Sequence, residues 1–553
     1  MTERFLLSAV LAVLPAFATA QEGTATKSAP PLPAGAPKGS DRIDAKGLRA
    51  QEDFFTSDDC AGRFTSSAGQ RKAAEHLAAH FKAMGFEPLG DVGKDGKPDY
   101  LQAWPVDRQR IDPEHCALTI GDAGHPRGFG VIPGLGEDAT QVRGRLVDCA
   151  FGAADDLPEE IHEGDIPFVM LRAKGRPGLR VEAQFMTGLG ILQKARSIAQ
   201  KLADRGAKCV LFGSLADDNG LGDFLNYCGL NPDKPLVAYG RDRGMAAMVE
   251  GMRTKGPMVF LSRALTEAAL VQLGRKVENG SVGDAPDPRP TAKAAIDLKV
   301  IEEQAEAWNV CAVLRGKDKK LAAEAVVFSA HMDHMGTRLD GQIFRGADDD
   351  GSGISSLCEI AEALKAGGPR KRSIVLLAVA GEEEGLWGSK HYSEHPTWPI
   401  EDIVADVNID MIGRNADLSG PDEISITPSY EHRKFSSIAQ HAARLAGNFG
   451  LSLTIGDKFY ERSDHFNFAV KGIPVVFFCD GEHPDYHQVT DTADKLEYEK
   501  MVRIVRLAYW VGCDVADAEE RPTELGRRGD WLEEKGGSEQ APAESKPSPR
   551  RRR

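Results

Sequence analysis

Four apolar runs in the last half of the chain each lead into histidines or acidic residues. EAVVFSA precedes His331, SIVLLAVAG precedes Glu382, and IVADVNI precedes Asp410. The fourth run, GIPVVFFCDG, precedes a loop that contains His487. Short apolar runs of this kind predict buried strands, and helical patterns alternate with them up to about residue 515. Because open α/β sheets bind ligands at the carboxyl ends of their strands, the sequence predicts a sheet with one polar edge.

Two further acidic segments lie beside these strands. GADDDGSG, at 346–353, places three acids on a glycine-flanked turn before ISSLCEIAEAL, whose apolar residues form a helical stripe. GEEEG, at 381–385, has three adjacent carboxylates, which repel one another unless a cation or solvent relieves them. Asp410 would be costly to bury without a partner. These features indicate a cation site.

Each segment alone also has an ordinary interpretation. HMDH, at 331–334, could be a polar exit from a strand, and the acids at 348–350 could cap a helix and interact with its dipole. GEEEG could be an exposed turn. The specific signal is the whole set, whose nitrogen and oxygen ligands suit zinc, manganese or cobalt. The nine cysteines have no CxxC spacing, so a zinc-thiolate site is not expected, although one or two disulfides could form in an oxidising compartment.

On these motifs the sequence resembles the co-catalytic zinc aminopeptidases, peptidase family M28, over roughly residues 53–515. The resemblance implies an α/β fold, a three-layer α/β/α sandwich with a mixed, mostly parallel sheet, and two zinc ions per chain. Asp349 would bridge the ions, with two residues completing each site. The implied metal ligands are His331, Asp349, Glu383, Asp410 and His487.

The same resemblance implies roles for the neighbouring residues. Glu382 matches the general base that works with a metal-bridging hydroxide, and Asp333 matches the residue that orients His331. The GLWGS segment at 385–389 fixes this register and leaves Glu384 without a role. Asp464 and His465, in YERSDHFNF, are expected to be supporting residues. His334 and His483 are expected to lie outside the ligand set.

The implied activity is that of an aminopeptidase acting on peptide or protein N-termini. Carboxypeptidases and dipeptidases share these ligands, and the sequence does not separate them. A cyclising aminoacyltransferase of the glutaminyl-cyclase type would work with one zinc ion, and a non-catalytic binding homologue would lack ligands. The net charge of −15 argues against nucleic acid as a partner.

The N-terminus has the pattern of a secretory signal. Arg4 is followed by FLLSAVLAVLPAF and by the small residues Ala18-Thr19-Ala20, so we expect cleavage near Gln21 and a secreted or periplasmic protein. The other apolar stretches are too short to span a bilayer, so stable membrane insertion is not expected.

A chain of 553 residues predicts more than one domain. The stretch AAEHLAAHFKAMG predicts a helix that ends at Gly85. Short strands broken by glycine and proline then form a middle block that resembles a protease-associated insert. The predicted organisation is a signal at 1–20, a disordered leader at 21–45, a catalytic domain at 46–109 and 291–516, an inserted smaller β-rich α/β domain at 110–290, and a disordered tail at 517–553.

Overall fold

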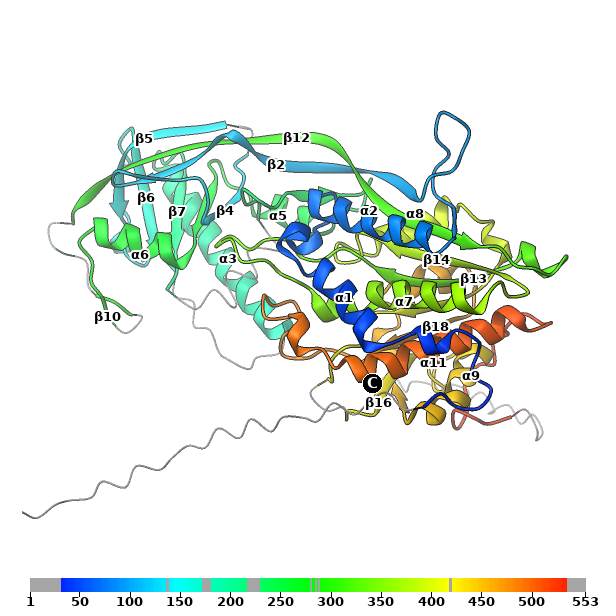
Figure 1. Cartoon of the computed structure of the whole chain (residues 1–553). Coiled ribbons are helices and arrows are strands. Elements are labelled where there is room, and N and C mark those ends of the chain that lie inside the picture. Colours follow the sequence, from blue (N-terminus) through cyan, green and yellow to red (C-terminus); the bar gives the residue numbers. More distant parts are fainter. Residues whose placement is uncertain are drawn as a thin grey trace, which may run out of the picture.

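The computed structural model describes residues 31–135, 139–171, 181–215, 229–278, 281–283, 286, 289–416 and 420–534. Within these residues the chain forms a 16-stranded mixed sheet with helices on its faces. A larger and a smaller part, each with its own hydrophobic core, are connected by a long two-stranded ribbon (Figure 1). The predicted signal at 1–20 and the stretches 21–30 and 535–553 lie outside the described residues.

The sheet of the larger part is built from the apolar runs predicted as strands. β13 (Ala325–His331) pairs in parallel with β14 (Ser373–Val379) on one side and with β15 (Ile403–Ile409) on the other. β18 (Val475–Cys479) continues the sheet in parallel with β15. Every residue of these four strands is buried, as expected for parallel strands covered on both faces.

The remaining strands of the larger part complete a mixed sheet. β16 (Glu423–Thr427) is antiparallel to β18 and parallel to β17 (Ser452–Ile455) at the edge. On the opposite side, β14 pairs antiparallel with the end of β12 (Thr291–Leu314), which also pairs with the short β1 (Glu87–Pro88).

Helices cover both faces, because alternate strand residues point in opposite directions. Phe328 of β13 belongs to the core that the first set of helices covers, whereas Val327 belongs to the core that the second set covers. The predicted three-layer α/β/α sandwich is therefore confirmed. The first set is α1 (Ala45–Phe55), α2 (Ala68–Ala83), α7 (Ser352–Gly367), α9 (Ser437–Ala446) and α11 (Tyr498–Asp517); the second is α8 (Trp387–Glu394) and α10 (His465–Val470).

Local signals explain where α1 and α2 begin and end. The side chain of Asp44 accepts hydrogen bonds from the backbone N–H groups of Lys46 and Gly47 at the start of α1. Ser67 caps α2 by accepting from Gln70 N. The chain turns at Gly85, whose φ of 87° is accessible to glycine without strain, so the predicted end of α2 is confirmed.

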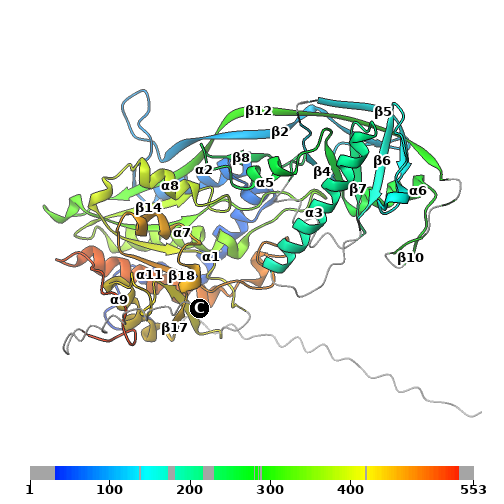
Figure 2. The same cartoon turned by 180° about the vertical axis from the view of Figure 1, so that it is seen from behind.

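The smaller part has a second core that includes residues between Ile111 and Leu298. Its parallel strands run in the order β5, β6, β7, β9, and β4 pairs antiparallel with β9. Figure 2 shows α3 beside these strands, seen from behind. The elements are β4 (Phe129–Ile132), β5 (Ala139–Asp148), β6 (Asp165–Met170), β7 (Val210–Gly213), β9 (Met258–Leu261), α3 (Val181–Asp204), α5 (Gly244–Met252) and α6 (Arg263–Gln272).

The ribbon consists of β2 (Leu101–Ile120) and β12, paired antiparallel along most of their length. Its far end joins the smaller part, where β5 pairs with β12. A third strand, β8 (Leu236–Ala238), pairs with the middle of β2. The predicted border after residue 109 therefore falls inside a strand that both parts share.

The structure differs from the predicted disorder at both ends of the described chain. In the leader, Lys38 O accepts a hydrogen bond from Tyr509 Oη at 2.8 Å. In the tail, Leu525 N donates to Phe435 O at 2.7 Å, and the Trp531 ring lies 4.9 Å from that of Tyr430. These segments have too little apolar content to fold alone. A few backbone hydrogen bonds and one aromatic contact hold them in a defined conformation.

Two other expectations concern the chain as a whole. The eight cysteines that the structure describes are free thiols, so no disulfide joins them. Among the described residues, no helix combines the length and the apolar character needed to cross a membrane.

Candidate metal centre

The predicted ligands converge at the carboxyl edge of the parallel strands. His331 is the last residue of β13, and Asp410 directly follows β15. Glu383 lies in the loop after β14, and His487 in the loop after β18. Asp349 comes from η5 (Ala347–Gly351), the irregular turn before α7. Parallel neighbours place their carboxyl ends side by side, so the strand order itself collects these side chains.

The first group consists of His331, Asp349 and Asp410. His331 Nε2 lies 3.2 Å from Asp349 Oδ1 and 3.5 Å from Asp410 Oδ1. One ligand atom from each residue lies within 4.8 Å of the others, and all three residues are buried. This geometry can hold one cation between an imidazole and two carboxylates.

The second group lies on the other side of Asp349. His487 Nε2 is 3.0 Å from Asp349 Oδ2 and 3.0 Å from Glu383 Oε2. Asp349 therefore presents one carboxylate oxygen to each group, which is the arrangement that a bridging ligand requires.

His334, which was expected outside the ligand set, also lies in the second group. Its side chain is fully buried, and its Nδ1 lies 2.6 Å from Glu383 Oε1 and 3.9 Å from Asp349 Oδ2. His334, Asp349 and Glu383 together form a further set whose ligand atoms lie within 4.8 Å of one another. The second group thus contains two histidines around one glutamate.

The donor atoms fit zinc. His331 Nε2, His334 Nε2 and Asp410 Oδ1 are buried without a hydrogen-bond partner in the described structure. A buried polar atom of this kind is unfavourable unless a further group binds it. Imidazole nitrogens and carboxylate oxygens, without thiolates, are ligands that zinc accepts in catalytic sites.

The electrostatics of the second group also favour a cation. Burial alone would lower the pKa of His487, yet the carboxylates of Glu383 and Asp349 raise it to about 10. The histidine thus takes up a proton to offset the negative charge around it. A bound cation would satisfy the same excess of negative charge.

The other two acids of the turn have structural contacts. Asp350 accepts hydrogen bonds from Gly353 N at 2.7 Å and from His331 N at 3.1 Å, so it caps α7 and ties the turn to β13. Asp348 accepts from Gly413 N at 2.6 Å and lies 3.1 Å from His483 Nε2. The helix-cap interpretation thus describes Asp350.

Glu382 lies beside the first group. Its Oε2 is 3.9 Å from His331 Nε2, and 12% of its side chain is exposed. Burial, followed by the repulsion of Asp410 and Glu383, raises the pKa of Glu382 well above its ordinary value, despite the opposing effect of His331. A carboxylate with this position and a raised pKa is suited to accept a proton.

Asp333 contacts its neighbours differently from the predicted arrangement. His331 Nδ1 is 3.2 Å from the backbone oxygen of Asp333 and 3.7 Å from its carboxylate. The carboxylate instead accepts hydrogen bonds from Thr65 Oγ1 at 2.8 Å and Glu382 N at 3.2 Å. Asp333 therefore connects the loop of His331 to the turn of Glu382.

The remaining predicted residues are buried around the centre. His483 is fully buried against Asp348. Burial lowers the pKa of His465 to about 3, and its ring stacks on Phe477 with centroids 4.5 Å apart. Burial raises the pKa of Asp464 to about 7, although the nearby His331 lowers it. These residues form the floor of the centre.

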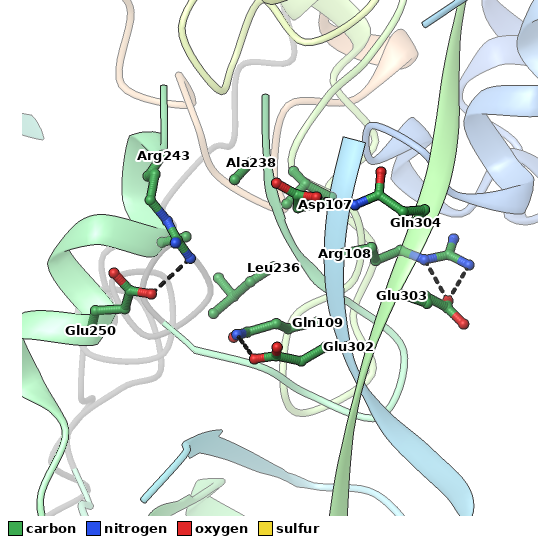
Figure 3. Close-up of a pocket in the computed structure, with 12 residues that line it drawn as sticks. Asp107, Arg108, Gln109, Leu236, Ala238, Arg243, Glu250, Glu302, Glu303 and Gln304 are labelled. Atoms are coloured by element: carbon green, nitrogen blue, oxygen red, sulfur yellow. Dashed lines mark hydrogen bonds and ion pairs between the residues drawn. The ribbon is translucent and has the colours of Figure 1, made fainter. Parts of the chain in front are cut away.

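A separate cavity of about 420 Å³ lies between the ribbon and α5. Figure 3 shows charged side chains paired with neighbours on the same wall, Arg243 with Glu250 and Arg108 with Glu303. Arg243 Nη2 lies 2.7 Å from Glu250 Oε1, and Gln109 Nε2 donates to Glu302 Oε1 at 2.6 Å. These interactions satisfy the polar lining within the protein, so we assign no ligand to this cavity.

Zinc-dependent peptidases include proteins with an α/β/α sandwich and with acids and histidines gathered at the carboxyl edge of its sheet. Residues 309–511 match the model of Peptidase family M28. The match contains every predicted ligand.

Individual relatives agree with this assignment. The chain is 27% identical over 237 residues to "Aminopeptidase YwaD" of Bacillus subtilis (strain 168), covering 42% of this chain and 49% of the relative. It is 27% identical over 227 residues to a "Probable leucine aminopeptidase" of Arthroderma otae, covering 39% and 60% respectively. The chain thus spans between 49% and 60% of the length of these two curated relatives.

A solved structure shares the fold. The zinc aminopeptidase BSAP from Bacillus subtilis matches with a TM-score of 0.51 and 19% identity, covering 86% of this chain and 96% of that one. At this identity the likeness supports the fold alone.

Two residues that contact the loops of the centre, Arg63 and Asp491, were not predicted from the sequence. Asp491 belongs to HPDYHQVTDT, at 483–492, the loop segment that contains His487. Its carboxylate accepts from Asp348 N at 3.0 Å and Asp349 N at 3.2 Å. The position of Asp491 directly before Thr492 could have indicated its role. Arg63 lies in a short irregular segment with no recognisable pattern, and only the structure shows its contacts.

Proposed function

We propose that this protein is a two-zinc aminopeptidase that hydrolyses the N-terminal bond of peptides or proteins. The observation that carries the proposal is the position of Asp349, whose two carboxylate oxygens face separate groups of ligands. His331 and Asp410 would complete one zinc site, and Glu383 and His487 the other. The family of residues 309–511 and the names of its relatives support this choice.

Two zinc ions in this centre would supply Lewis acidity to the substrate carbonyl and would lower the pKa of the attacking water. Glu382, which is near the ligands but outside their set, would take the proton of the attacking water and pass it to the leaving amine. Asp333 holds the backbone of Glu382 while its own main chain faces His331.

The buried carboxylates also suit a positively charged substrate group. Glu382 and Asp464 lie near enough to interact electrostatically, and neither belongs to the proposed ligand set. A free N-terminal ammonium group would find compensating negative charge there, which favours an aminopeptidase.

Hydrolysis of matched substrates tests the proposal. Dipeptides and aminoacyl anilides, each with a free or an N-acetylated amine, would be incubated with zinc-loaded protein. We expect cleavage of the free-amine set alone, loss of activity with a chelator, and recovery with zinc. Equal cleavage of blocked peptides that have a free carboxylate would replace the proposal with a carboxypeptidase. Cyclisation of N-terminal glutamine by protein with one bound zinc ion would replace the proposal with a transferase. The absence of any turnover would replace it with a binding protein.

We further propose that residues 1–20 direct export and that the protein acts in a secreted or periplasmic location. The pattern of Arg4, the apolar run and Ala18-Thr19-Ala20 supports this. Mass spectrometry of the mature N-terminus in an expressing cell should find a chain that begins near Gln21. An intact N-terminus on cytoplasmic protein would contradict it.

A further inference from the structure

A fully buried arginine lies beneath the candidate metal centre. Arg63 ends η2 (Asp58–Arg63), the irregular segment between α1 and α2, and its side chain is one of the largest with almost no exposure. The guanidinium of arginine carries five N–H donors in a rigid plane. In Arg63 these donors contact four backbone carbonyl oxygens from three parts of the chain. Nε donates to Met332 O at 2.8 Å, Nη1 to Phe55 O at 2.7 Å and Arg345 O at 2.8 Å, and Nη2 to Gly346 O at 2.8 Å.

Two of these contacts reach the loops that carry ligands. Met332 directly follows His331, and Gly346 opens the turn that contains Asp349. The guanidinium therefore spans the gap between the loop after β13 and the turn before α7. These two loops supply the histidine of the first group and the carboxylate shared by both groups.

The backbone around Arg63 adds to the same connection. His334 N donates to Arg63 O at 3.3 Å, and Gly336 N donates to Gly62 O at 3.0 Å. Gly62 has a φ of 72°, and a Cβ at this position would lie 2.3 Å from Gly336 O. Only glycine allows this close approach. Thr65 extends the contact by donating to the carboxylate of Asp333.

The charge of Arg63 is not balanced by a direct carboxylate partner among the described residues. The carboxylate of Glu52, fully buried on α1, is near enough for Arg63 to lower its pKa against the larger effect of burial. Burying a guanidinium is unfavourable unless its donors are satisfied. Here backbone carbonyls satisfy them, so the side chain depends on the exact placement of the two loops and in turn fixes it.

Arg372 shows what a buried arginine does elsewhere in this chain. It is 1% exposed, and it donates to Glu324 Oε2 at 2.6 Å and to Val515 O at 2.9 Å. These contacts connect the start of β14 to the end of α11, at the edge of the sheet opposite the metal centre. Arg372 therefore offers a matched comparison with equal burial and similar carbonyl contacts.

We propose that Arg63, with Thr65, is a positioning residue that sets the spacing between His331 and Asp349 and thereby the zinc affinity of the centre. The inference rests on the proposed two-zinc function, since it concerns the same ligands. Outer contacts of metal ligands typically change metal affinity or activity by about 10–100-fold when they are removed.

The test compares Arg63→Lys with Arg372→Lys. Lysine keeps the charge but has three donors on a flexible stem and cannot span four carbonyls. Zinc affinity would be measured by competition with a chromophoric chelator, and the unfolding midpoint of the metal-free protein by circular dichroism. We expect both variants to lower the midpoint, but only Arg63→Lys to bind zinc about 10–100-fold more weakly.

A zinc affinity of Arg63→Lys equal to that of wild type, or an equal loss in Arg372→Lys, would overturn the inference. If metal-free Arg63→Lys does not fold, Thr65→Val keeps the shape of the side chain and removes its hydrogen bond to Asp333; unchanged zinc affinity in that variant would also overturn it. Wild-type protein that binds zinc but cleaves no peptide would reject the proposed function and leave the comparison of Arg63 with Arg372 intact.

Discussion

His334 Nδ1 lies 2.6 Å from Glu383 Oε1, on the side of the carboxylate opposite His487. One glutamate therefore contacts two buried histidines, and the second metal site has two imidazoles within reach. The resemblance to the family assigns the ligand role to His487. In that case His334 acts on the metal through Glu383, by fixing the orientation of its carboxylate.

Substitution of the two histidines separates these roles. We expect His487→Ala to keep one zinc ion per chain, because the second site loses a ligand. His334→Ala should keep two ions but bind the weaker one about 10–100-fold less tightly, because only the orientation of Glu383 is lost. Elemental analysis after dialysis against defined free zinc measures both, with exposed His162→Ala as the control. If His334→Ala binds one zinc ion and His487→Ala binds two, then His334 is the metal ligand and His487 is the residue that orients Glu383.

Glu382→Gln should lower kcat by about 10²–10⁴-fold while both zinc ions remain, because the amide cannot accept the proton of the attacking water. Glu384→Gln is the matched control, since it makes the same change in the same turn at a residue without an assigned role. Steady-state kinetics on a cleaved aminoacyl anilide, with zinc counted in the same samples, gives the answer. Near-normal turnover in Glu382→Gln would remove the general-base assignment.

The sequence predicts the polar edge of the sheet because strand patterns are local. β13, β14, β15 and β18 are read from short apolar runs, and their parallel arrangement brings the residues that follow them together. His331 and Asp410 could therefore be placed near each other without any knowledge of long-range contacts. Their pairing with Asp349 followed from the family resemblance, and the structure brings the three together.

Contacts that depend on distant segments could not be predicted in this way. Arg63 reaches Met332 across 269 positions and Gly346 across 283 positions, and nothing in its local sequence marks these partners. The carboxylate of Asp333 turns to Thr65, 268 positions away, for the same reason. His483 was expected outside the ligand set. The structure buries it against Asp348, which lies in another loop.

Removal of zinc should destabilise the folded protein. Metal that binds only the folded state at about 100 times its Kd contributes about 2.7 kcal/mol, which corresponds to a rise in Tm of roughly 2–4 °C for a chain of this size. We expect thermal unfolding to shift upward with zinc concentration and to return after chelation. His331→Ala serves as the control and should show a much smaller shift. A Tm of wild type that does not depend on zinc would argue against binding at the buried centre.

The carboxyl group of Glu359 should make the free energy of unfolding depend on pH, independently of the metal centre. This residue of α7 is 4% exposed and accepts a hydrogen bond from Asp44 N at 3.0 Å. Burial, and then the nearby Asp44 and Glu362, raise the pKa of Glu359 to about 7, although the hydrogen bond lowers it. The folded state thus holds a proton that the unfolded chain releases above its ordinary pKa of about 4.5. Stability from this group is fully present below that value and is lost as the pH rises through about 7.

Glu359→Gln keeps the acceptor for Asp44 N and removes the titration. Its advantage over wild type should therefore grow between pH 4.5 and 7 and then level off, with an upper value of roughly 3 kcal/mol. Urea unfolding of chelator-treated protein at several pH values measures this difference without a contribution from zinc binding. Glu306→Gln makes the same change in net charge at an exposed position of β12 and serves as the control. A difference between Glu359→Gln and wild type that stays constant across this range would show that burial of Glu359 does not set the pH dependence.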